Sequence, residues 1–253
     1  MEIREVEASP GRRRFAGASG FVELLESGLD HTARIQLTEP EFAPWVALHD
    51  YALDVARLSG ASRVVSVLRE DDPDVDRLRG AGYRAGWRSW GASLELPDQP
   101  DWTPYDDLAL AEVEVRELAP ADAEAAYGTY CAAAGDFPQT PATLHDRLGP
   151  AEFAGLIVTD RVFGAFAQGR CLGLTVSRMD GATVDTRFTV TGPQWRGRGI
   201  AAMTKAVMIR TLHAEGARVF RTGGAEANLP MLAVNRRVGY RREPWWVTYV
   251  MAI

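Results

Sequence analysis

The sequence predicts an α/β protein (α+β in its mixed arrangement) with two related units in tandem, each a mixed central sheet flanked by helices. In both halves of the 253 residues, strand-like runs alternate with amphipathic segments of helical spacing. Between the halves, residues 97–107 are rich in proline and acidic side chains and have no apolar period. We therefore expect domains at 1–97 and 112–253, joined by a linker at 98–111.

The order of elements in the two halves indicates an internal duplication. Each half contains a strand, a helix, a Gly-Tyr pair and a further strand: 63–68, 71–80, Gly82-Tyr83 and 90–96 in the first, and 218–222, 228–238, Gly239-Tyr240 and 246–251 in the second. In the second half we also expect a strand at 113–118, a helix from Pro120 to Ala134, a short helix capped at 140–143, a hairpin at 161–178 and a strand at 183–191.

Composition argues against several classes of function. The net charge of −6 and the pI near 5.3 argue against a nucleic-acid partner. The sequence has no run of about eighteen apolar residues and begins with charged residues, so we expect no membrane partner and a cytoplasmic location. Two cysteines and four dispersed histidines make no zinc pattern, and no metal site is expected.

The first motif follows the strand at 183–191. It reads Gln-Trp-Arg-Gly-Arg-Gly-Ile-Ala over residues 194–201 and opens a long amphipathic segment. Glycines at 197 and 199 let the backbone approach a ligand closely, and the first N–H groups of a helix favour an anion. The motif therefore predicts a pyrophosphate site. The glycine fingerprints of P-loop and dinucleotide-binding proteins are absent.

The second motif lies about thirty residues later, after the strand at 218–222. Asn228 can cap a helix whose early turn tolerates Pro230, and Gly239 stands where a helix ends in a left-handed residue. Asn228 and Asn235 are seven residues apart, so we expect them to share one face of this helix.

Together, Arg-Gly-Arg-Gly before a helix and Asn-x-x-Met with Asn-x-x-x-Gly-Tyr after the next strand resemble the GCN5-related N-acetyltransferase (GNAT) superfamily. The resemblance extends to actinobacterial tandem acetyltransferases of the mycothiol synthase type, in which one half is active and the other degenerate. It implies that residues 112–253 bind the acyl donor and that residues 1–97 are a truncated unit. In the first half, residues 38–45 have no glycine and carry two carboxylates, which would repel phosphate.

The resemblance implies acetyl-CoA as acyl donor and the amine of a small molecule as acceptor, such as an antibiotic, a biosynthetic intermediate or an amino sugar. We expect a monomer or homodimer. The residues implied in acetyl-CoA binding are Thr189, Val190, Thr191, Arg196, Gly197, Arg198, Gly199, Ile200, Ala201, Asn228 and Asn235. Those implied in acceptor binding are Tyr130, Asp136 and Phe137.

Proton transfer leaves alternatives open. Many family members have a tyrosine seven residues after the asparagine of the second motif, where this chain has Asn235. An amide can donate a hydrogen bond to a thiolate but no proton. Either Asn235 only stabilises the thiolate, or Tyr240, Tyr249 or solvent supplies the proton.

For the base that takes the amine proton, Asp185 is the first candidate and Glu226 the second, and a surface salt bridge is the alternative role for each. The missing tyrosine also keeps a second function open, a GNAT-like module that binds acyl-CoA without catalysis.

Overall fold

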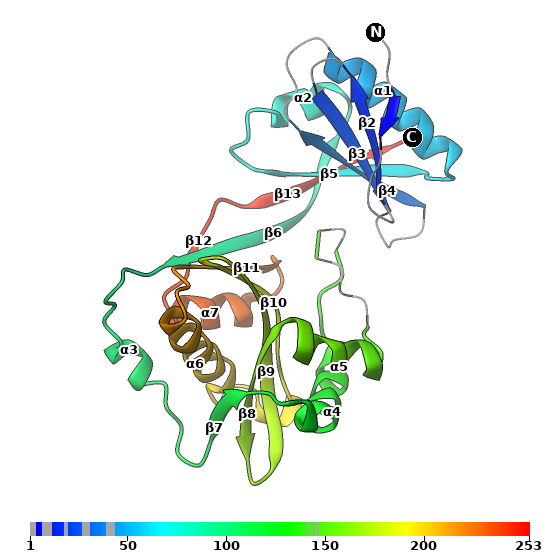
Figure 1. Ribbon diagram of the computed structural model, residues 1–253. Helices are drawn as coiled ribbons and strands as arrows, with labels where there is room; N and C mark the ends of the chain where they lie inside the picture. The colour runs from blue at the N-terminus through cyan, green and yellow to red at the C-terminus, as the bar shows by residue number, and fades with distance from the viewer. Residues whose placement is uncertain are drawn as a thin grey trace. The chain divides into compact units, whose positions relative to one another are not determined.

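A computed structural model describes residues 4–6, 12–17, 20–26, 31–38, 44–140, 142–143, 145 and 147–253. The chain forms two compact units, the first from Met1–Ser89, Gln139–Leu144 and Pro244–Ile253, and the second from Trp90–Pro138 and His145–Glu243 (Figure 1). The expected boundaries at 1–97, 98–111 and 112–253 treat the domains as consecutive and stay a prediction. By contacts, the last strand of the chain belongs to the first unit.

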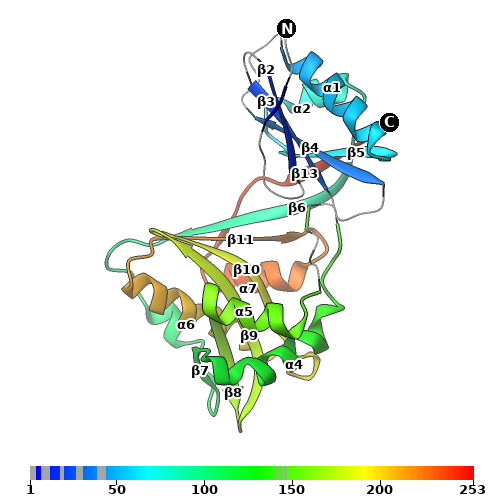
Figure 2. The same ribbon diagram turned by 45° about the vertical axis from the view of Figure 1, so that its right-hand side comes forward.

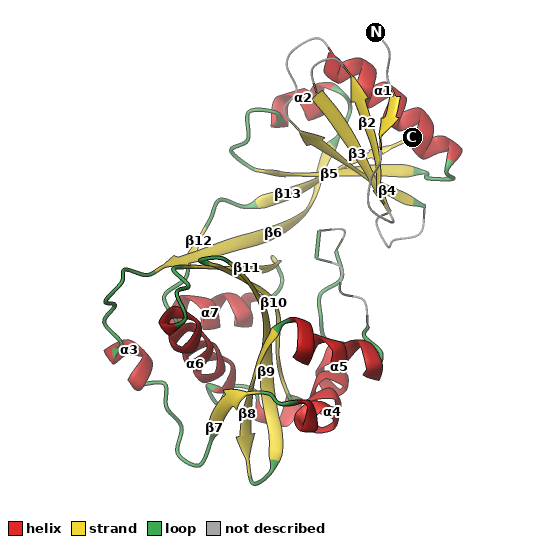
Figure 3. Ribbon diagram, in the orientation of Figure 1, coloured by secondary structure: helices red, strands yellow, loops and turns green. Residues whose placement is uncertain are grey.

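The first unit contains strands β1 to β5, helices α1 and α2, strand β13 and the first half of β6 (Figure 3). Their bounds are Arg4–Val6, Arg12–Gly17, Gly20–Glu26, Thr32–Thr38 and Arg63–Arg69 for β1 to β5, Pro44–Leu58 for α1, Val75–Gly80 for α2, Arg84–Glu95 for β6 and Trp246–Ala252 for β13. The strand order is β1-β2-β3-β4-β5-β13-β6, and β13 pairs antiparallel with both β5 and β6.

The core of the first unit explains why residues 44–58 form a helix. Leu48, Ala52 and Val55 recur at intervals of four and three residues and are buried, so α1 presents one apolar face. This face belongs to the same core cluster as Val64 of β5 and Tyr249 of β13. The last strand therefore completes both the sheet and the core of this unit.

The second unit contains the end of β6 and all remaining elements (Figure 2). Their bounds are Thr103–Asp106 for α3, Glu114–Glu117 for β7, Ala123–Ala134 for α4, Pro150–Thr159 for α5, Arg161–Ala167 for β8, Arg170–Asp180 for β9, Thr183–Thr191 for β10, Ile200–Ala214 for α6, Val219–Ala225 for β11, Leu229–Arg237 for α7 and Arg241–Arg242 for β12. The order is β6-β11-β10-β9-β8-β7, with β12 paired to β6; β10 and β11 are parallel.

Helices cover both faces of the sheet of the second unit, with α4 and α5 on one face and α6 and α7 on the other (Figure 1). Tyr130 of α4 packs in one cluster with Leu174 and Phe188 of the sheet. Ile200 of α6 packs with Leu172 in a separate cluster. The predicted α/β fold, with a mixed sheet flanked by helices, is confirmed.

The end of the pairing between β10 and β11 sets the geometry of the second unit. Thr183–Asp185 pairs with Val219–Arg221, and pairing ends there. The register of β10 against β9 shifts between Thr186 and Phe188, which marks a β-bulge. Beyond Asp185, the edge of β10 that faces β11 therefore has no strand partner in the described part of the chain.

The first unit repeats this arrangement, as the duplication predicts. Strand β4 pairs parallel with β5 over three residues, from Thr32 to Arg34, and the helix between them has the same 15-residue length as α6. The prediction that the first unit lacks an anion site falls largely on residues 39–43, which lie outside the described residues.

Two expectations about helices need correction. The second helix of the second half begins at Pro150 and not near Thr143, because the Glu152 carboxylate accepts the Gly149 N–H at 2.7 Å and a proline suits the first helical position. The expected linker also contains the short helix α3, where Asp101 accepts the Thr103 N–H at 2.9 Å.

The pair Gly223-Gly224 makes room for a core side chain, Trp90. A Cβ atom on Gly224 would stand 2.6 Å from Cζ2 of the buried Trp90 ring. The Trp90 indole N–H donates to the Ala225 carbonyl at 3.0 Å. The absence of side chains at Gly223 and Gly224 therefore lets Trp90 pack directly on the backbone of β11.

The second unit buries a lysine. Lys205 of α6 is the only lysine of the sequence, its residue is 0% exposed, and its Nζ donates to the Thr186 hydroxyl at 3.4 Å. Nζ also lies 5.0 Å from the centre of the Tyr240 ring. Burial lowers the pKa of the Lys205 ammonium to about 7, because an apolar interior disfavours the charged form.

We predict that Lys205→Met raises the free energy of unfolding by a few kcal/mol at pH 7 and below, where the folded protein carries a buried charge. Between pH 7 and about 10.5 the unfolded chain holds a proton on Lys205 that the folded chain lacks, so wild-type stability rises with pH. The difference between variant and wild type should therefore shrink up to pH 10. Urea unfolding at several pH values measures it, and a pH-independent difference would contradict the prediction.

Candidate functional site

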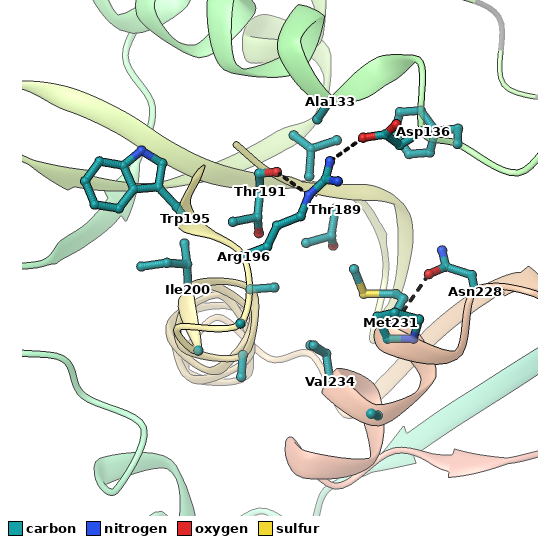
Figure 4. Close-up of a pocket in the computed structure, with 18 of the residues that line it drawn as sticks. Ala133, Asp136, Thr189, Thr191, Trp195, Arg196, Ile200, Asn228, Met231 and Val234 are labelled. Atoms are coloured by element: carbon teal, nitrogen blue, oxygen red, sulfur yellow. Dashed lines mark hydrogen bonds and ion pairs between the residues drawn. The ribbon is translucent and has the colours of Figure 1, made fainter. Parts of the chain in front are cut away.

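The second unit contains a cavity of about 580 Å³ at the ends of β10 and α4 and the beginnings of α6 and α7 (Figure 4). Its volume lies in the range typical of small-molecule sites. Of the residues predicted from the sequence, it is lined by Asp136, Phe137, Thr189, Val190, Thr191, Arg196, Gly197, Gly199, Ile200, Ala201 and Asn228. The structure thus brings the two sequence motifs together.

One wall is the N-terminus of α6. Gly197 and Gly199 adopt positive φ angles of 72° and 85°, and no side chain caps the helix. A Cβ atom on Gly197 would meet no heavy atom within 4 Å, so the turn faces open space. The first N–H groups of α6 have no acceptor within the helix, and the helix dipole adds positive potential. This wall can bind an anion.

Two arginines add charge to this wall. Arg196 points toward Asp136 and Thr191 in Figure 4, with Nη2 2.7 Å from the Asp136 carboxylate and Nε 3.3 Å from the Thr191 carbonyl. The guanidinium of Arg237 lies 3.8 Å from the position that a Cβ atom on Gly199 would take. Arg198, by contrast, stacks at 5.1 Å over the Trp195 ring and does not line the cavity.

A second wall is the end of β10. Thr189 and Thr191 line the cavity, and the Thr189 hydroxyl shares a 2.8 Å hydrogen bond with that of Thr175 on β9. Because β10 leaves β11 after Asp185, this part of the strand has a backbone edge without a strand partner. Such an edge can bind an extended polar chain through its N–H and C=O groups.

The third wall is α7. Asn228 caps this helix, with its side-chain oxygen 3.4 Å from the Met231 N–H, and it lines the cavity. Asn235, expected on the same face, does not line it. Asn228 has non-helical backbone angles, so counting seven residues from it does not locate the cavity face of the helix.

Asn235 is instead fully buried, and neither its amide nitrogen nor its oxygen has a hydrogen-bond partner among the described protein atoms. Arg237, which the sequence interpretation missed, faces the cavity with Pro230 and Val234. Pro230, Val234 and Arg237 are spaced by four and three residues, so they share one face of α7. Counting from Pro230, in the first turn of the helix, would therefore have located Val234 and Arg237.

The other predicted residues lie elsewhere. Asp185 and Glu226 are exposed and do not line the cavity, so their catalytic roles stay predictions. Tyr130 is a fully buried core residue whose hydroxyl accepts the Leu148 N–H at 3.0 Å. Tyr240 is buried beside Lys205, and Tyr249 belongs to β13 of the first unit.

Within the described ranges, no group of three or more His, Cys, Asp or Glu side chains could hold a metal ion. In the same residues, no helix has the length and apolar character needed to cross a membrane.

No family model matches the sequence, and no curated protein matches it either. Solved structures match nearly the whole chain. A GCN5-related N-acetyltransferase from Sphaerobacter thermophilus is 16% identical with a TM-score of 0.71, and the match covers 98% of this chain and 82% of that one. A tandem GNAT protein from the clavulanic acid biosynthesis pathway is 20% identical with a TM-score of 0.70, covering 97% and 84%.

A third structure, a GCN5-related N-acetyltransferase from Kribbella flavida, is 18% identical with a TM-score of 0.62, and the match covers 95% of this chain and 89% of that one. All three resemble both units of this chain rather than one. The chain therefore has the fold of the GCN5-related N-acetyltransferase superfamily, in its tandem form.

Proposed function

We propose that the protein is an acyl-CoA-dependent N-acetyltransferase that moves the acetyl group of acetyl-CoA to the amine of a small molecule. The observation that carries this proposal is the uncapped N-terminus of α6, with Gly197 and Gly199 in left-handed conformations, facing a cavity beside the free edge of β10. Release of free thiol from acetyl-CoA with a panel of amines tests the activity.

The residues of the cavity suit the parts of acetyl-CoA. The N–H groups after Gly197 would bind the pyrophosphate, and the guanidinium groups of Arg196 and Arg237 would add charge-assisted contacts. The edge of β10 from Thr189 to Thr191 would bind the amides of the pantetheine arm. Asn228 would bind the same arm from the side of α7.

Asp136 and Phe137 form the side of the cavity that suits an amine acceptor. Of the residues predicted to bind the acceptor, Asp136 contributes a carboxylate to the cavity wall, and 60% of its side chain is exposed. A carboxylate attracts a cationic amine, and the Phe137 ring offers apolar surface to its carbon skeleton. In the ligand-free protein Asp136 forms an ion pair with Arg196. A bound phosphate would attract the Arg196 guanidinium toward the turn at Gly197.

A second candidate function is an acyl-CoA-binding module without catalysis. It is favoured by Asn235, which stands where many relatives of this fold have a tyrosine acid and which cannot donate a proton. Acetyl-CoA binding without thiol release for any amine would support this alternative.

We predict one acetyl-CoA per chain and loss of binding in Gly197→Asp. The aspartate would place negative charge beside the pyrophosphate path, and a Cβ at a φ of 72° is strained. Isothermal titration calorimetry measures stoichiometry and affinity. Gly169→Asp is the matched control, because Gly169 has a φ of 74°, has equally open space and lies in the β8–β9 turn away from the cavity.

Wild-type affinity in a folded Gly197→Asp variant would show that the turn has only a structural role. An equal loss of binding in Gly169→Asp would attribute the effect to strain. Two equivalent sites per chain would contradict the proposal that the second unit alone binds the donor.

We predict that Asp136→Asn raises KM for the amine acceptor about tenfold to a hundredfold, since a charge-assisted contact contributes about 1.5–3 kcal/mol. Affinity for acetyl-CoA should be unchanged or higher, because Arg196 is released from its ion pair. Steady-state kinetics with each substrate varied measures both. An unchanged KM for the amine would remove Asp136 from the acceptor site.

Asp185 keeps its predicted role as base only if it acts through water, because it lies outside the cavity. In that case Asp185→Asn lowers kcat by about 10²–10⁴ at neutral pH, and the loss shrinks as the pH approaches the pKa of the amine. A pH–rate profile measures this. Normal turnover, or an equal loss at every pH, would exclude the role.

A further inference from the structure

A polar cluster lies in the second unit outside the lining of the cavity. Its members are Lys205 of α6, Thr186 of β10 and Tyr240, which Lys205 contacts, and Asn235 of α7, whose backbone carbonyl accepts the Tyr240 N–H at 3.0 Å. Lys205 and Asn235 are 0% exposed and Tyr240 is 4% exposed. The amide of Asn235 and the hydroxyl of Tyr240 have no hydrogen-bond partner among the described protein atoms.

The cluster is built on the same three elements as the cavity. On α6, Lys205 comes three residues after the lining residue Ala202. On β10, Thr186 comes three residues before Thr189, and on α7 Asn235 directly follows Val234. Thr186 also stands at the bulge where β10 leaves β11. The cluster therefore lies at the closed end of the gap between the two strands.

The contacts of Lys205 do not explain why a lysine is buried there. Its recorded partners are the Thr186 hydroxyl and the Tyr240 ring, and neither is anionic. Burying an ammonium without a carboxylate costs stability that a methionine of similar size would not cost. Residues that weaken a fold in this way are concentrated at functional sites.

We propose that Lys205 supplies the proton to the thiolate that leaves during acyl transfer, acting through the hydroxyls of this cluster. The inference rests on the proposed function and fills the role that Asn235 cannot perform. The Thr186 hydroxyl accepts a hydrogen bond from Lys205 and can donate one onward, and a hydroxyl such as that of Tyr240 can both accept and donate. Lys205 is thus a positioning and proton-supplying residue.

The step balances as follows in atoms and charge. The amine nitrogen of the acceptor bonds to the carbonyl carbon of the thioester, and the carbon–sulfur bond breaks with its electron pair on sulfur. The sulfur takes a proton that comes from the Lys205 ammonium. The attacking amine loses its proton to solvent. Solvent returns a proton to Lys205, which restores its ammonium.

The titratable groups around Lys205 support this direction of transfer. Burial lowers the pKa of Lys205 to about 7, so its ammonium is a stronger acid than an ordinary thiol. Burial raises the pKa of Tyr240, and Asp185 and Tyr105 raise it further while Thr186 partly offsets the rise. Tyr240 is therefore a poor source of the proton, although its hydroxyl can pass one on.

The first test does not depend on turnover. Because the sequence has one lysine, protein labelled with ¹³C-lysine gives a single ε-methylene resonance, and its titration yields the pKa of Lys205. CoA oxidised to its sulfonate carries a negative charge at the sulfur position throughout this titration, so we expect it to raise this pKa. Desulfo-CoA, which lacks the sulfur, should leave it unchanged. Equal responses to both ligands would overturn the proposal.

The second test is the pH dependence of kcat. In the wild type, kcat should fall above about pH 7 as Lys205 loses its proton. Lys205→Met should lower kcat about tenfold to a hundredfold at pH 6.5, leave KM for acetyl-CoA unchanged and abolish the fall. Arg210→Met, which removes an exposed basic side chain five residues further along α6, is the control and should behave like the wild type.

The outcomes separate the two proposals. Acetyl-CoA binding and thiol release in the wild type with an unaltered pH profile in Lys205→Met would overturn the role of Lys205 and leave the proposed function intact. Failure of the wild type to bind acetyl-CoA or CoA in calorimetry would overturn both. Lys205→Arg, which keeps the positive charge but cannot give up a proton, should be as slow as Lys205→Met. Wild-type rates in Lys205→Arg would assign the effect to charge and contradict proton supply.

Discussion

The second unit depends on the place where two parallel strands stop pairing. Strands β10 and β11 exchange hydrogen bonds over Thr183–Asp185 and Val219–Arg221 and then diverge. Divergence leaves backbone groups without partners, and a protein tolerates this only where other groups replace them. The free edge of β10 follows from this interruption of the sheet, and the cavity and the N-terminus of α6 lie beside that edge.

The surrounding packing keeps the interruption open. On the side of β11, the ring of Trp90 packs on Gly224 and its indole N–H donates to the Ala225 carbonyl, which binds the end of β11 to β6. On the side of β10, a bulge after Thr186 turns the strand. At the closed end between them stand Lys205 and Asn235, polar groups in a place where apolar ones would be more stable. These buried polar groups lower the stability of the fold at the point where β10 and β11 diverge.

Local signals in the sequence predicted the parts of the site that are local in the chain. The turn at Gly197 and Gly199 and the cap at Asn228 are made by residues close in sequence, and the structure places all three around one cavity. The orientation of Asn235 was not predictable in this way. It depends on the non-helical start of α7 and on how this helix is packed in the second unit, where Asn235 is buried.

The same distinction holds for the fold. The alternation of strands and helices, the hairpin and the duplicated order of elements were predicted from local pattern. The partners of β13 were not, because an apolar strand at 246–252 suits either unit by its pattern alone. Its pairing with Arg63–Arg69 is a contact across more than half of the chain, and such contacts leave no local signal.

The position of β13 has a consequence for how the protein is made. The chain leaves the ribosome from its N-terminus, and domains begin to fold as they emerge. The second unit uses residues 90–243, apart from 139–144, so all the residues it needs precede β13 in the chain. The first unit lacks the strand that joins β5 to β6 until residues 246–252 follow. The unit whose residues are translated first is thus the last to be completed. Until then, its unpaired strand edges are the part of the nascent protein that can aggregate or bind chaperones.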